Sequence, residues 1–193
     1  MTKVTEQKTG KNWKKLAAIT VLLAVVYVAF SVIMMYISHP TQTHRDITRQ
    51  NYELQSSMWS SMDSEESFEE YENKLDALAE KPEAQYIAKL QVVEIVASLA
   101  VSVVIIGLLY NYIRKNRLAG DATWATVITD VIATLISVAA IVPIYGLFYN
   151  YHQPLLEVVF MLIGAATLGL VFTYIVARIF QWRYDRKHSF VVE

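Results

Sequence analysis

The chain has 193 residues, of which 54% are hydrophobic and 18% are charged, and this balance is too apolar for a small soluble domain. The formal net charge is −1, and we expect no nucleic-acid partner. Because the chain contains no cysteine, disulfides, thiolate metal sites, cysteine nucleophiles and thiol redox chemistry are excluded.

The apolar residues are gathered in four uncharged runs, each of about 20 residues, the length that a helix rising 1.5 Å per residue needs to cross a hydrocarbon core of about 30 Å. These runs are 16–37, 95–113, 131–149 and 158–177. The predicted fold class is an all-α integral membrane protein, a bundle of four transmembrane helices with an extracytoplasmic helical hairpin between helices 1 and 2. In chain order we predict a cytoplasmic N-terminus (1–15), a first span (16–37), the extracytoplasmic segment (38–91), a second span (92–113), a cytoplasmic loop (114–122), a third span (123–149), an extracytoplasmic turn (150–156), a fourth span (157–179) and a cytoplasmic C-terminus (180–193).

The first apolar run follows five lysines, as the hydrophobic region of a secretory signal would. It is too long for a typical signal sequence, however, and it ends at Ser38-His39-Pro40 without a small-residue cleavage site. We therefore predict a retained signal anchor. Since Pro40 lacks a backbone donor and restricts the residue before it, this helix should end near His39.

Residues 38–91 are predicted to form two amphipathic helices, because apolar side chains recur at helical spacing in both halves of the segment. They are Ile47, Leu54, Met58 and Met62 in the first half and Phe68, Tyr71, Leu75 and Leu78 in the second. Asp63-Ser64 followed by Glu65 indicates the start of the second helix. Pro82 marks its end, and a further helix should then continue into the second span.

Apolar and aromatic side chains of this segment are candidates for binding another membrane or extracytoplasmic protein. They are Trp59, Phe68, Tyr71, Leu75 and Leu78. The alternative, which we favour, is that they pack the hairpin on itself, because an amphipathic stripe normally faces its own core. Cation binding is the functional interpretation of the acids beside them, but we prefer a solvated helix face, and no EF-hand spacing is present. Those acids are Glu65, Glu66, Glu69, Glu70 and Glu72.

The orientation follows from the distribution of charge. Residues 1–15 carry five Lys or Arg against one acid, and residues 114–121 carry three against one. The C-terminal tail from Arg178 carries four against two, whereas residues 38–90 carry five basic groups against eleven acids. Basic segments mark the cytoplasmic face, so both termini are predicted to be cytoplasmic in a multi-pass cell-membrane protein. A specific anionic-lipid site is the alternative reading of such basic residues, but clusters of this size usually only anchor a helix.

The tryptophans give the same orientation. Trp13, Trp124 and Trp182 each flank a predicted span on the basic face, where amphipathic indoles favour the headgroup region. Three tyrosines would serve in the same way at the other end of the third span. They are Tyr145, Tyr149 and Tyr151.

Asp130 is the candidate for an ion or proton pathway, because an ionisable group deep in a bilayer is expensive and is a functional hypothesis by default. The uncharged run 131–149 is already long enough to span the membrane without it, which favours an interfacial or cap-like acid instead. If the helix begins at Thr123, Asp130 lies roughly 10 Å deep and a functional role gains weight.

Two histidines and two glutamates are weak candidates for a metal site or a pH-responsive cluster, because the topology places them at similar depth on the outer face. They are His39, His152, Glu94 and Glu157, with His44 nearby. They come from separate segments and no local spacing links them, so interfacial groups that are solvated or paired are preferred, and neither a metal nor a cofactor is expected.

Small residues recur four apart within the spans, the pattern that lets transmembrane helices approach closely. They are Ser98, Ser102, Ala133, Ser137, Ala165 and Gly169. Packing within one bundle explains them, and a homo-oligomer is compatible with them but not required. Pro143 and Gly146 indicate a kink in the third span.

No motif of a hydrolase, a metalloprotease or a phosphate-binding loop occurs, so we expect no enzyme. The leading hypothesis is a non-enzymatic accessory, scaffold or partner-binding subunit of a membrane complex that acts through its acidic extracytoplasmic hairpin. The alternative is a small oligomeric channel or transporter that uses Asp130 or the outer histidine and glutamate groups. A sensor would need a partner to carry its output, because only a short tail follows the last span.

Overall fold

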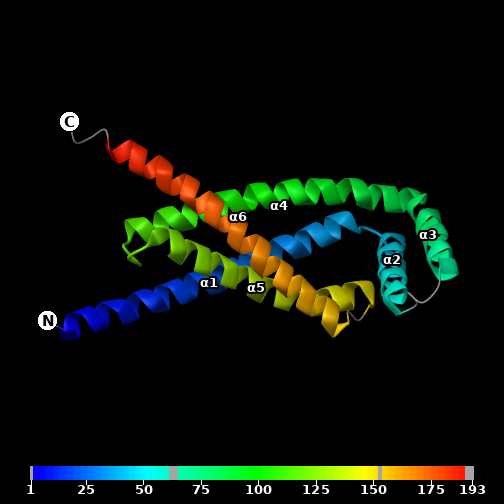
Figure 1. Cartoon of the computed structure of the whole chain (residues 1–193), viewed down its shortest axis with the longest axis horizontal. Helices are drawn as coiled ribbons and strands as arrows, with labels where there is room; N and C mark the ends of the chain where they lie inside the picture. Colours follow the sequence, from blue (N-terminus) through cyan, green and yellow to red (C-terminus); the bar gives the residue numbers. More distant parts are fainter. Residues whose placement is uncertain (1, 61–64, 152–153, 190–193) are drawn as a thin grey trace. The chain divides into compact units, whose positions relative to one another are not determined.

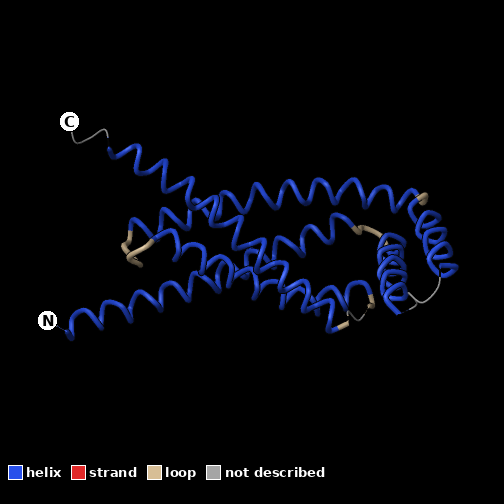
Figure 2. Tube along the Cα trace, viewed as in Figure 1, coloured by secondary structure: helices blue, strands red, loops and turns tan. Residues whose placement is uncertain are grey.

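The computed structural model describes residues 2–60, 65–151 and 154–189, and the side chains of 12–57, 68–151 and 154–187. Within these ranges the chain is helical and has no strand (Figures 1 and 2). The helices are α1 (Thr2–Ser38), α2 (Gln42–Ser60), α3 (Glu65–Ala79), α4 (Pro82–Lys115), α5 (Ala122–Tyr149) and α6 (Leu155–Ser189).

Four of these helices are long and apolar enough to cross a membrane. The stretches are Asn12–Ser38, Pro82–Lys115, Ala122–Tyr149 and Leu155–Lys187. Large apolar side chains on them face outward, and Leu108, Leu147 and Leu168 are 66%, 86% and 73% exposed. Exposed apolar surface on this scale is unfavourable in water. The four apolar helices fit a multi-pass membrane protein.

The predicted helices are confirmed, and most of them extend beyond the predicted bounds. Helix α1 ends at Ser38, as the restriction imposed by Pro40 predicts. Helix α4 begins at Pro82 and continues without a break to Lys115, so the helix expected after Pro82 does run into the second apolar stretch. Helix α5 begins at Ala122. The start signal predicted for α3, Asp63-Ser64, lies outside the described residues.

The chain divides into two compact units. The first combines the described parts of Met1–Ala29, Ser98–Ala140 and Leu155–Glu193, and the second combines Phe30–Ala97 with Ile141–Pro154. Helices α1, α4 and α5 each contribute to both units, whereas α2 and α3 belong to the second and α6 to the first.

Helices α4 and α6 pack closely in the first unit. Ile106, Val176 and Ala177 form a buried cluster, and Phe180 packs against it. Gly107 makes room for this ring, because a Cβ added at Gly107 would lie 2.5 Å from Cζ of Phe180. Of the small residues predicted at helix contacts, Ala133 is fully buried. Any side chain at Gly107 would therefore require the ring of Phe180 to shift, and the four-residue spacing did not identify this position.

Replacing Gly107 by alanine should lower the free energy of unfolding by about 1–2 kcal/mol, because overpacking forces the ring of Phe180 out of its position. Gly164 provides a matched control, since an added Cβ there meets nothing within 4 Å. The Gly164→Ala variant should be as stable as the wild type or slightly more stable, because alanine has the higher helix propensity. Thermal unfolding in detergent measures both, and equal stabilities of the two variants would contradict the proposed close packing.

The end of α4 is fixed by a C-terminal capping motif. The backbone N–H of Leu118 donates to the carbonyl of Ile113 and that of Arg117 donates to the carbonyl of Arg114, each at 3.1 Å. Arg117 has a φ of 49°, the left-handed conformation that usually ends a helix in this way. Leu118 and Ile113 then meet in a buried cluster with Leu16 and Leu109. This apolar contact sets the direction of the loop between α4 and α5.

Asp121 begins α5. Its Oδ1 accepts hydrogen bonds from the backbone N–H groups of Thr123 and Trp124, at 2.9 and 3.1 Å. This is the geometry of an N-cap, in which a short acidic side chain satisfies the free donors of the first turn. The cap-like role considered for Asp130 therefore belongs to Asp121.

The other end of α5 uses the same device as α4. Asn150 has a φ of 52°, and the N–H of Tyr151 donates to the carbonyl of Gly146 at 3.1 Å. A Cβ at Gly146 would lie 3.1 Å from the carbonyl oxygen of Tyr151, so the glycine permits the chain to fold back closely. Helix α5 continues through Pro143 without a break, from Ala122 to Tyr149.

In the second unit, α2 and α3 lie side by side as a hairpin (Figure 1). Ile47 of α2, Leu78 of α3 and Ile87 of α4 form its buried core, and Leu54 and Ala84 pack against this core. The hairpin thus buries one apolar face against itself and the start of α4, which confirms that part of the stripe is internal packing.

Candidate functional site

The strongest candidate site surrounds Asp130, which lies eight residues after the start of α5, about 12 Å along the helix axis. The side chain is 4% exposed. Tyr27 of α1 donates its hydroxyl to Oδ1 at 2.5 Å, and Thr173 of α6 donates its hydroxyl to Oδ2 at 2.7 Å. Each carboxyl oxygen therefore has a donor from a different helix, and the site is enclosed by the chain itself.

This arrangement links three helices through one carboxyl group. Interhelical hydrogen bonds of this kind contribute about 0.6–2 kcal/mol each in membrane proteins, so a structural role accounts for the geometry. A buried ionisable group in an apolar helix is equally a default candidate for an ion or proton pathway. Because Asp130 is enclosed and both its oxygens are bonded, ion movement through it would require Tyr27 or Thr173 to move.

A second polar centre surrounds His39, which is 7% exposed just after α1. Its Nε2 lies 2.8 Å from Oγ1 of Thr48 on α2, and its Nδ1 lies 3.1 Å from the hydroxyl of Tyr149 on α5. The rings of His39 and Tyr149 meet edge to face at 5.0 Å. Tyr149 also contacts Tyr52, which stacks on Tyr151 with ring centroids 5.5 Å apart. Of the three tyrosines predicted at this helix end, Tyr149 is therefore the one that contacts His39 directly.

Burial lowers the pKa of His39 below its usual value of 6.5, and the nearby His44 and Arg45 act in the same direction, whereas the contact with the carbonyl of Met35 opposes them. The neutral ring is therefore the form that the folded chain prefers. It can satisfy Thr48 and Tyr149 with one donor and one acceptor nitrogen.

This shift predicts acid sensitivity of the second unit. Because the folded pKa lies below the unfolded one, the stabilising contribution is complete above pH 6.5 and is lost as the pH falls through the folded value. In the His39→Gln variant the amide can still bond to Thr48 and Tyr149, and its stability should vary less with pH below 6.5. Thermal unfolding from pH 7.5 to 5 compares the two, and identical slopes would show that His39 does not titrate on unfolding.

Of the four residues predicted for a metal site, His39, Glu94 and Glu157 lie in the described part of the chain. No group of three or more His, Asp or Glu side chains within it is placed to hold a metal ion. His152 lies outside the described residues. His39 instead bonds to protein groups, and Glu94 and Glu157 are each partly buried.

The hairpin separates the predicted partner-binding residues into buried and accessible ones. Leu78 is 7% exposed in the hairpin core, so of the two roles considered for it the structure supports the packing role. Leu75 and Tyr71 are partly buried, and Phe68 is 49% exposed with its ring 6.4 Å from that of Tyr71. The side chain of Trp59 is outside the described set.

The acidic side chains of α3 that are described lie at the surface. Glu69, Glu70 and Glu72 are exposed, and Glu70 pairs with Lys74 at 2.6 Å. This pairing lowers the pKa of Glu70. The accessible part of α3 therefore combines Phe68 with carboxylates, of which one is already paired within the helix.

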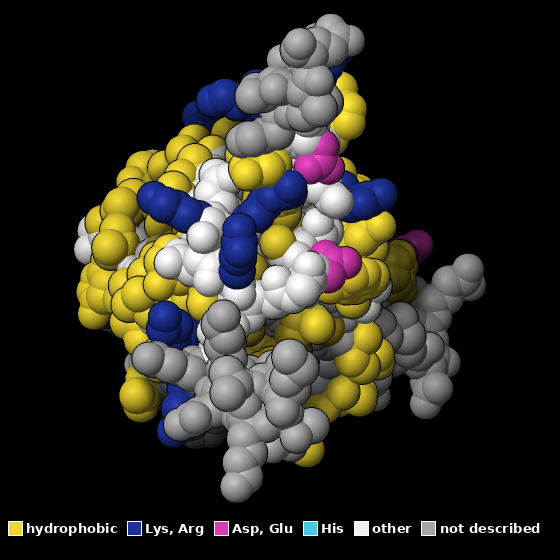
Figure 3. All heavy atoms as spheres, turned by 90° about the vertical axis from the view of Figure 1, so that its left-hand side faces the viewer, with side chains coloured by type: hydrophobic (Ala, Val, Ile, Leu, Met, Phe, Trp, Pro, Cys, Tyr) yellow, Lys and Arg dark blue, Asp and Glu magenta, His cyan; other side chains and the backbone are white. Residues whose placement is uncertain are grey.

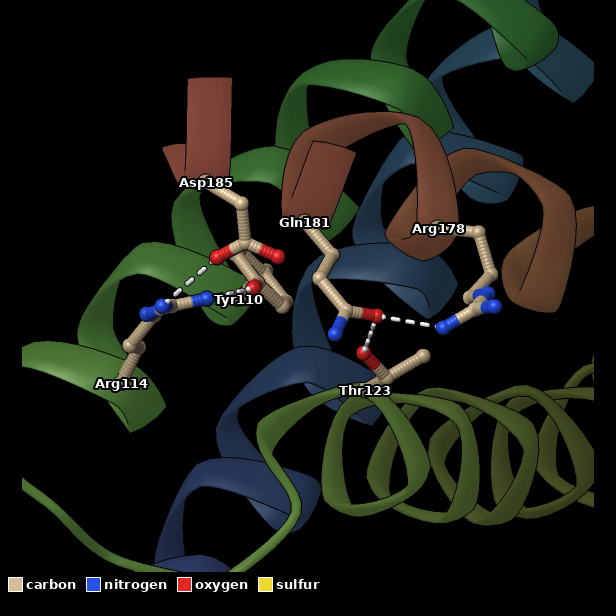
Figure 4. Close-up of polar contacts among 6 residues, drawn as sticks. All are labelled: Tyr110, Arg114, Thr123, Arg178, Gln181 and Asp185. Atoms are coloured by element: carbon tan, nitrogen blue, oxygen red, sulfur yellow. Dashed lines mark hydrogen bonds and ion pairs between the residues drawn. The ribbon is translucent and has the colours of Figure 1, made fainter. Parts of the chain in front are cut away.

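A third polar group lies in the first unit where α4, α5 and α6 meet (Figure 4). Arg114 donates from Nη1 to the hydroxyl of Tyr110 at 2.6 Å and from Nη2 to Oδ1 of Asp185 at 3.0 Å. The oxygen of Gln181 accepts from Oγ1 of Thr123 at 3.1 Å and from Nη1 of Arg178 at 2.8 Å. These contacts border a polar cavity of about 530 Å³.

Comparison with known proteins gives no relative. No protein-family model, curated protein or solved structure matches this chain.

The sequence pattern identifies Asp130 and His39 but not the residues that bond to them. Tyr27 and Thr173 are hydroxyl residues within otherwise apolar runs, a feature that is frequent in membrane helices and does not single them out. Thr48 lies in a polar segment, where a hydroxyl is equally ordinary. Their pairing depends on which helices are neighbours, and spacing along one helix does not contain that information.

Proposed function

We propose that this protein is a non-enzymatic multi-pass protein of the cell membrane that serves as an accessory, scaffold or partner-binding subunit of a membrane complex. In this proposal both termini are cytoplasmic and the α2–α3 hairpin is extracytoplasmic. The alternation of basic and non-basic segments supports the orientation. The partner is a membrane or extracytoplasmic protein.

The observation that carries this proposal is that some apolar residues of the hairpin are buried in a core while another remains exposed. Ile47, Leu78 and Ile87 form a buried core between the hairpin and the start of α4, so this part of the stripe is already covered within the chain. Phe68 stays 49% exposed on α3, next to the exposed carboxylates of Glu69 and Glu72. An aromatic anchor surrounded by charge is typical of a binding surface, and a basic partner surface complements it.

Co-purification in a mild detergent tests this function. The wild-type protein should retain a specific partner, and Phe68→Ala or Glu72→Lys should release it while the helix content stays unchanged. Glu80→Lys is the matched control, because Glu80 is also exposed but lies just beyond the end of α3. The proposal would be contradicted if the wild-type protein were recovered without a partner, or if Glu80→Lys released the partner as fully as Glu72→Lys does.

A small oligomeric channel or transporter is the second candidate, and the enclosed Asp130 is the observation that favours it. Reconstituted wild-type protein should then carry a proton or cation flux across vesicles, and Asp130→Asn should abolish it. Flux that is unchanged in this variant would remove Asp130 from the mechanism.

A further inference from the structure

The polar cavity in the first unit is formed by the end of α4, the loop that follows it, the start of α5 and the last turns of α6. The cavity of about 530 Å³ lies within the size range of small-ligand sites. The side chains with polar ends in its lining are Tyr110, Arg114, Arg117, Asp121, Thr123, Gln181 and Tyr184. Figure 3 shows the face of the molecule on which Lys and Arg side chains surround polar surface.

Arg114 is held in position before any ligand arrives. Its guanidinium bonds to Tyr110 and Asp185 and lies 3.6 Å from the ring centroid of Tyr184. A guanidinium has five N–H donors, and the contacts with Tyr110 and Asp185 use one N–H on each of two nitrogens. A group fixed in this way loses little conformational freedom on binding, and it retains donors for an additional acceptor.

Gln181 contributes an oriented donor. Its amide oxygen accepts from Thr123 and from Arg178, and because a guanidinium can only donate, the contact with Arg178 fixes which end of the amide is the oxygen. The amide nitrogen consequently points away from Arg178 (Figure 4). Since Gln181 lines the cavity, its N–H₂ group is available to an acceptor there.

Two carboxylates near the cavity each have one oxygen bonded within the chain, and two guanidinium groups line it. Asp121 caps the first turn of α5 and Asp185 pairs with Arg114. Arg117 is exposed, and its left-handed backbone conformation places it in the loop that lines the cavity. A ligand that offers several anionic oxygens satisfies these donors, and guanidinium groups match phosphate oxygens in charge and geometry.

We propose that this cavity binds a phosphate group, carried either by an anionic phospholipid headgroup or by a soluble phosphate compound, through Arg114, Arg117 and Gln181. Basic pockets between membrane helices bind phospholipid headgroups through the same chemistry. The site lies in the first unit and does not depend on the function proposed for the hairpin.

The test uses the full-length protein in a nonionic detergent with two probes, dioleoylphosphatidylglycerol and inorganic phosphate. Native mass spectrometry measures retained lipid, and thermal stability is measured in phosphate and in chloride at equal ionic strength. Arg117→Gly should weaken binding about tenfold through loss of one charged contact. It should not unfold the chain, because glycine suits the left-handed conformation of this residue. Gln181→Glu should also weaken binding, since it replaces the oriented donor by a carboxylate.

Lys115→Gln is the matched control, because Lys115 is exposed, lies two residues from Arg117 and does not line the cavity. It should bind both probes as the wild type does. Retention of the lipid alone identifies a headgroup site, and stabilisation by inorganic phosphate identifies a site open to soluble phosphate compounds. The proposal is overturned if the wild type binds neither probe. It is also overturned if Lys115→Gln weakens binding as much as Arg117→Gly does.

Discussion

The Asp130→Ala variant is expected to lose about 3 kcal/mol of unfolding free energy, because the substitution leaves two hydroxyl groups unpaired at about 1–3 kcal/mol each. Thr173 is 1% exposed and has no access to solvent, while Tyr27 is only partly enclosed and can recover some of its loss. The link between α1, α5 and α6 is lost at the same time. Unfolding in mixed micelles with increasing denaturing detergent measures the change.

A double-mutant cycle separates this network from a general effect of polarity. Asp130→Ala and Tyr27→Phe should each destabilise the chain, and the double variant should lose about 1 kcal/mol less than the sum. Tyr112→Phe is the control, because Tyr112 is 48% exposed on a long apolar helix and should tolerate the loss of its hydroxyl. Additive effects of the first two substitutions would mean that the hydrogen bond from Tyr27 contributes no stability.

The sequence predicts the helices well because length and hydropathy act along a single segment. An uncharged run of about 20 residues leaves few alternatives to a helix, and Pro40 and Pro82 restrict where neighbouring helices begin and end. The ends are less predictable. The continuation of α1 to Thr2 and of α6 to Ser189 depends on polar residues that carry no strong helix signal.

The same reasoning along one segment did not identify the surroundings of Asp130. The length of 131–149 showed that the membrane could be crossed without it, and this argument favoured a boundary position or a cap. The structure gives the cap to Asp121 and encloses Asp130 between Tyr27 and Thr173. These partners lie 103 and 43 residues away in the chain, so only the choice of neighbouring helices brings them together.

The hairpin shows a different limit of prediction. The spacing correctly predicts one amphipathic face on α3, formed by Phe68, Tyr71, Leu75 and Leu78. The neighbouring helices cover only part of this face, so some of its residues lie in the core and others at the surface. Leu78 is buried and Phe68 is 49% exposed, although both belong to the same stripe. Ile47 and Ile87 cover Leu78, and the residues of the stripe that they do not cover are the ones that another protein can contact.

The Leu78→Ala variant is expected to destabilise the hairpin by about 2–4 kcal/mol, the usual cost of removing a buried leucine side chain and leaving a cavity. The small core of Ile47, Leu78 and Ile87 has few other apolar groups with which to fill the space. Amide hydrogen exchange should therefore accelerate throughout α2 and α3, while the long apolar helices α5 and α6 keep their protection.

Phe68→Ala distinguishes the two halves of the stripe. Because the ring of Phe68 is half exposed, its removal should leave exchange in α2 and α3 close to the wild-type rate while weakening partner binding. Leu78→Ala should impair partner binding as well, but only together with faster exchange. If Phe68→Ala accelerates exchange as much as Leu78→Ala does, the aromatic ring belongs to the core, and the surface proposed for partner binding is not available.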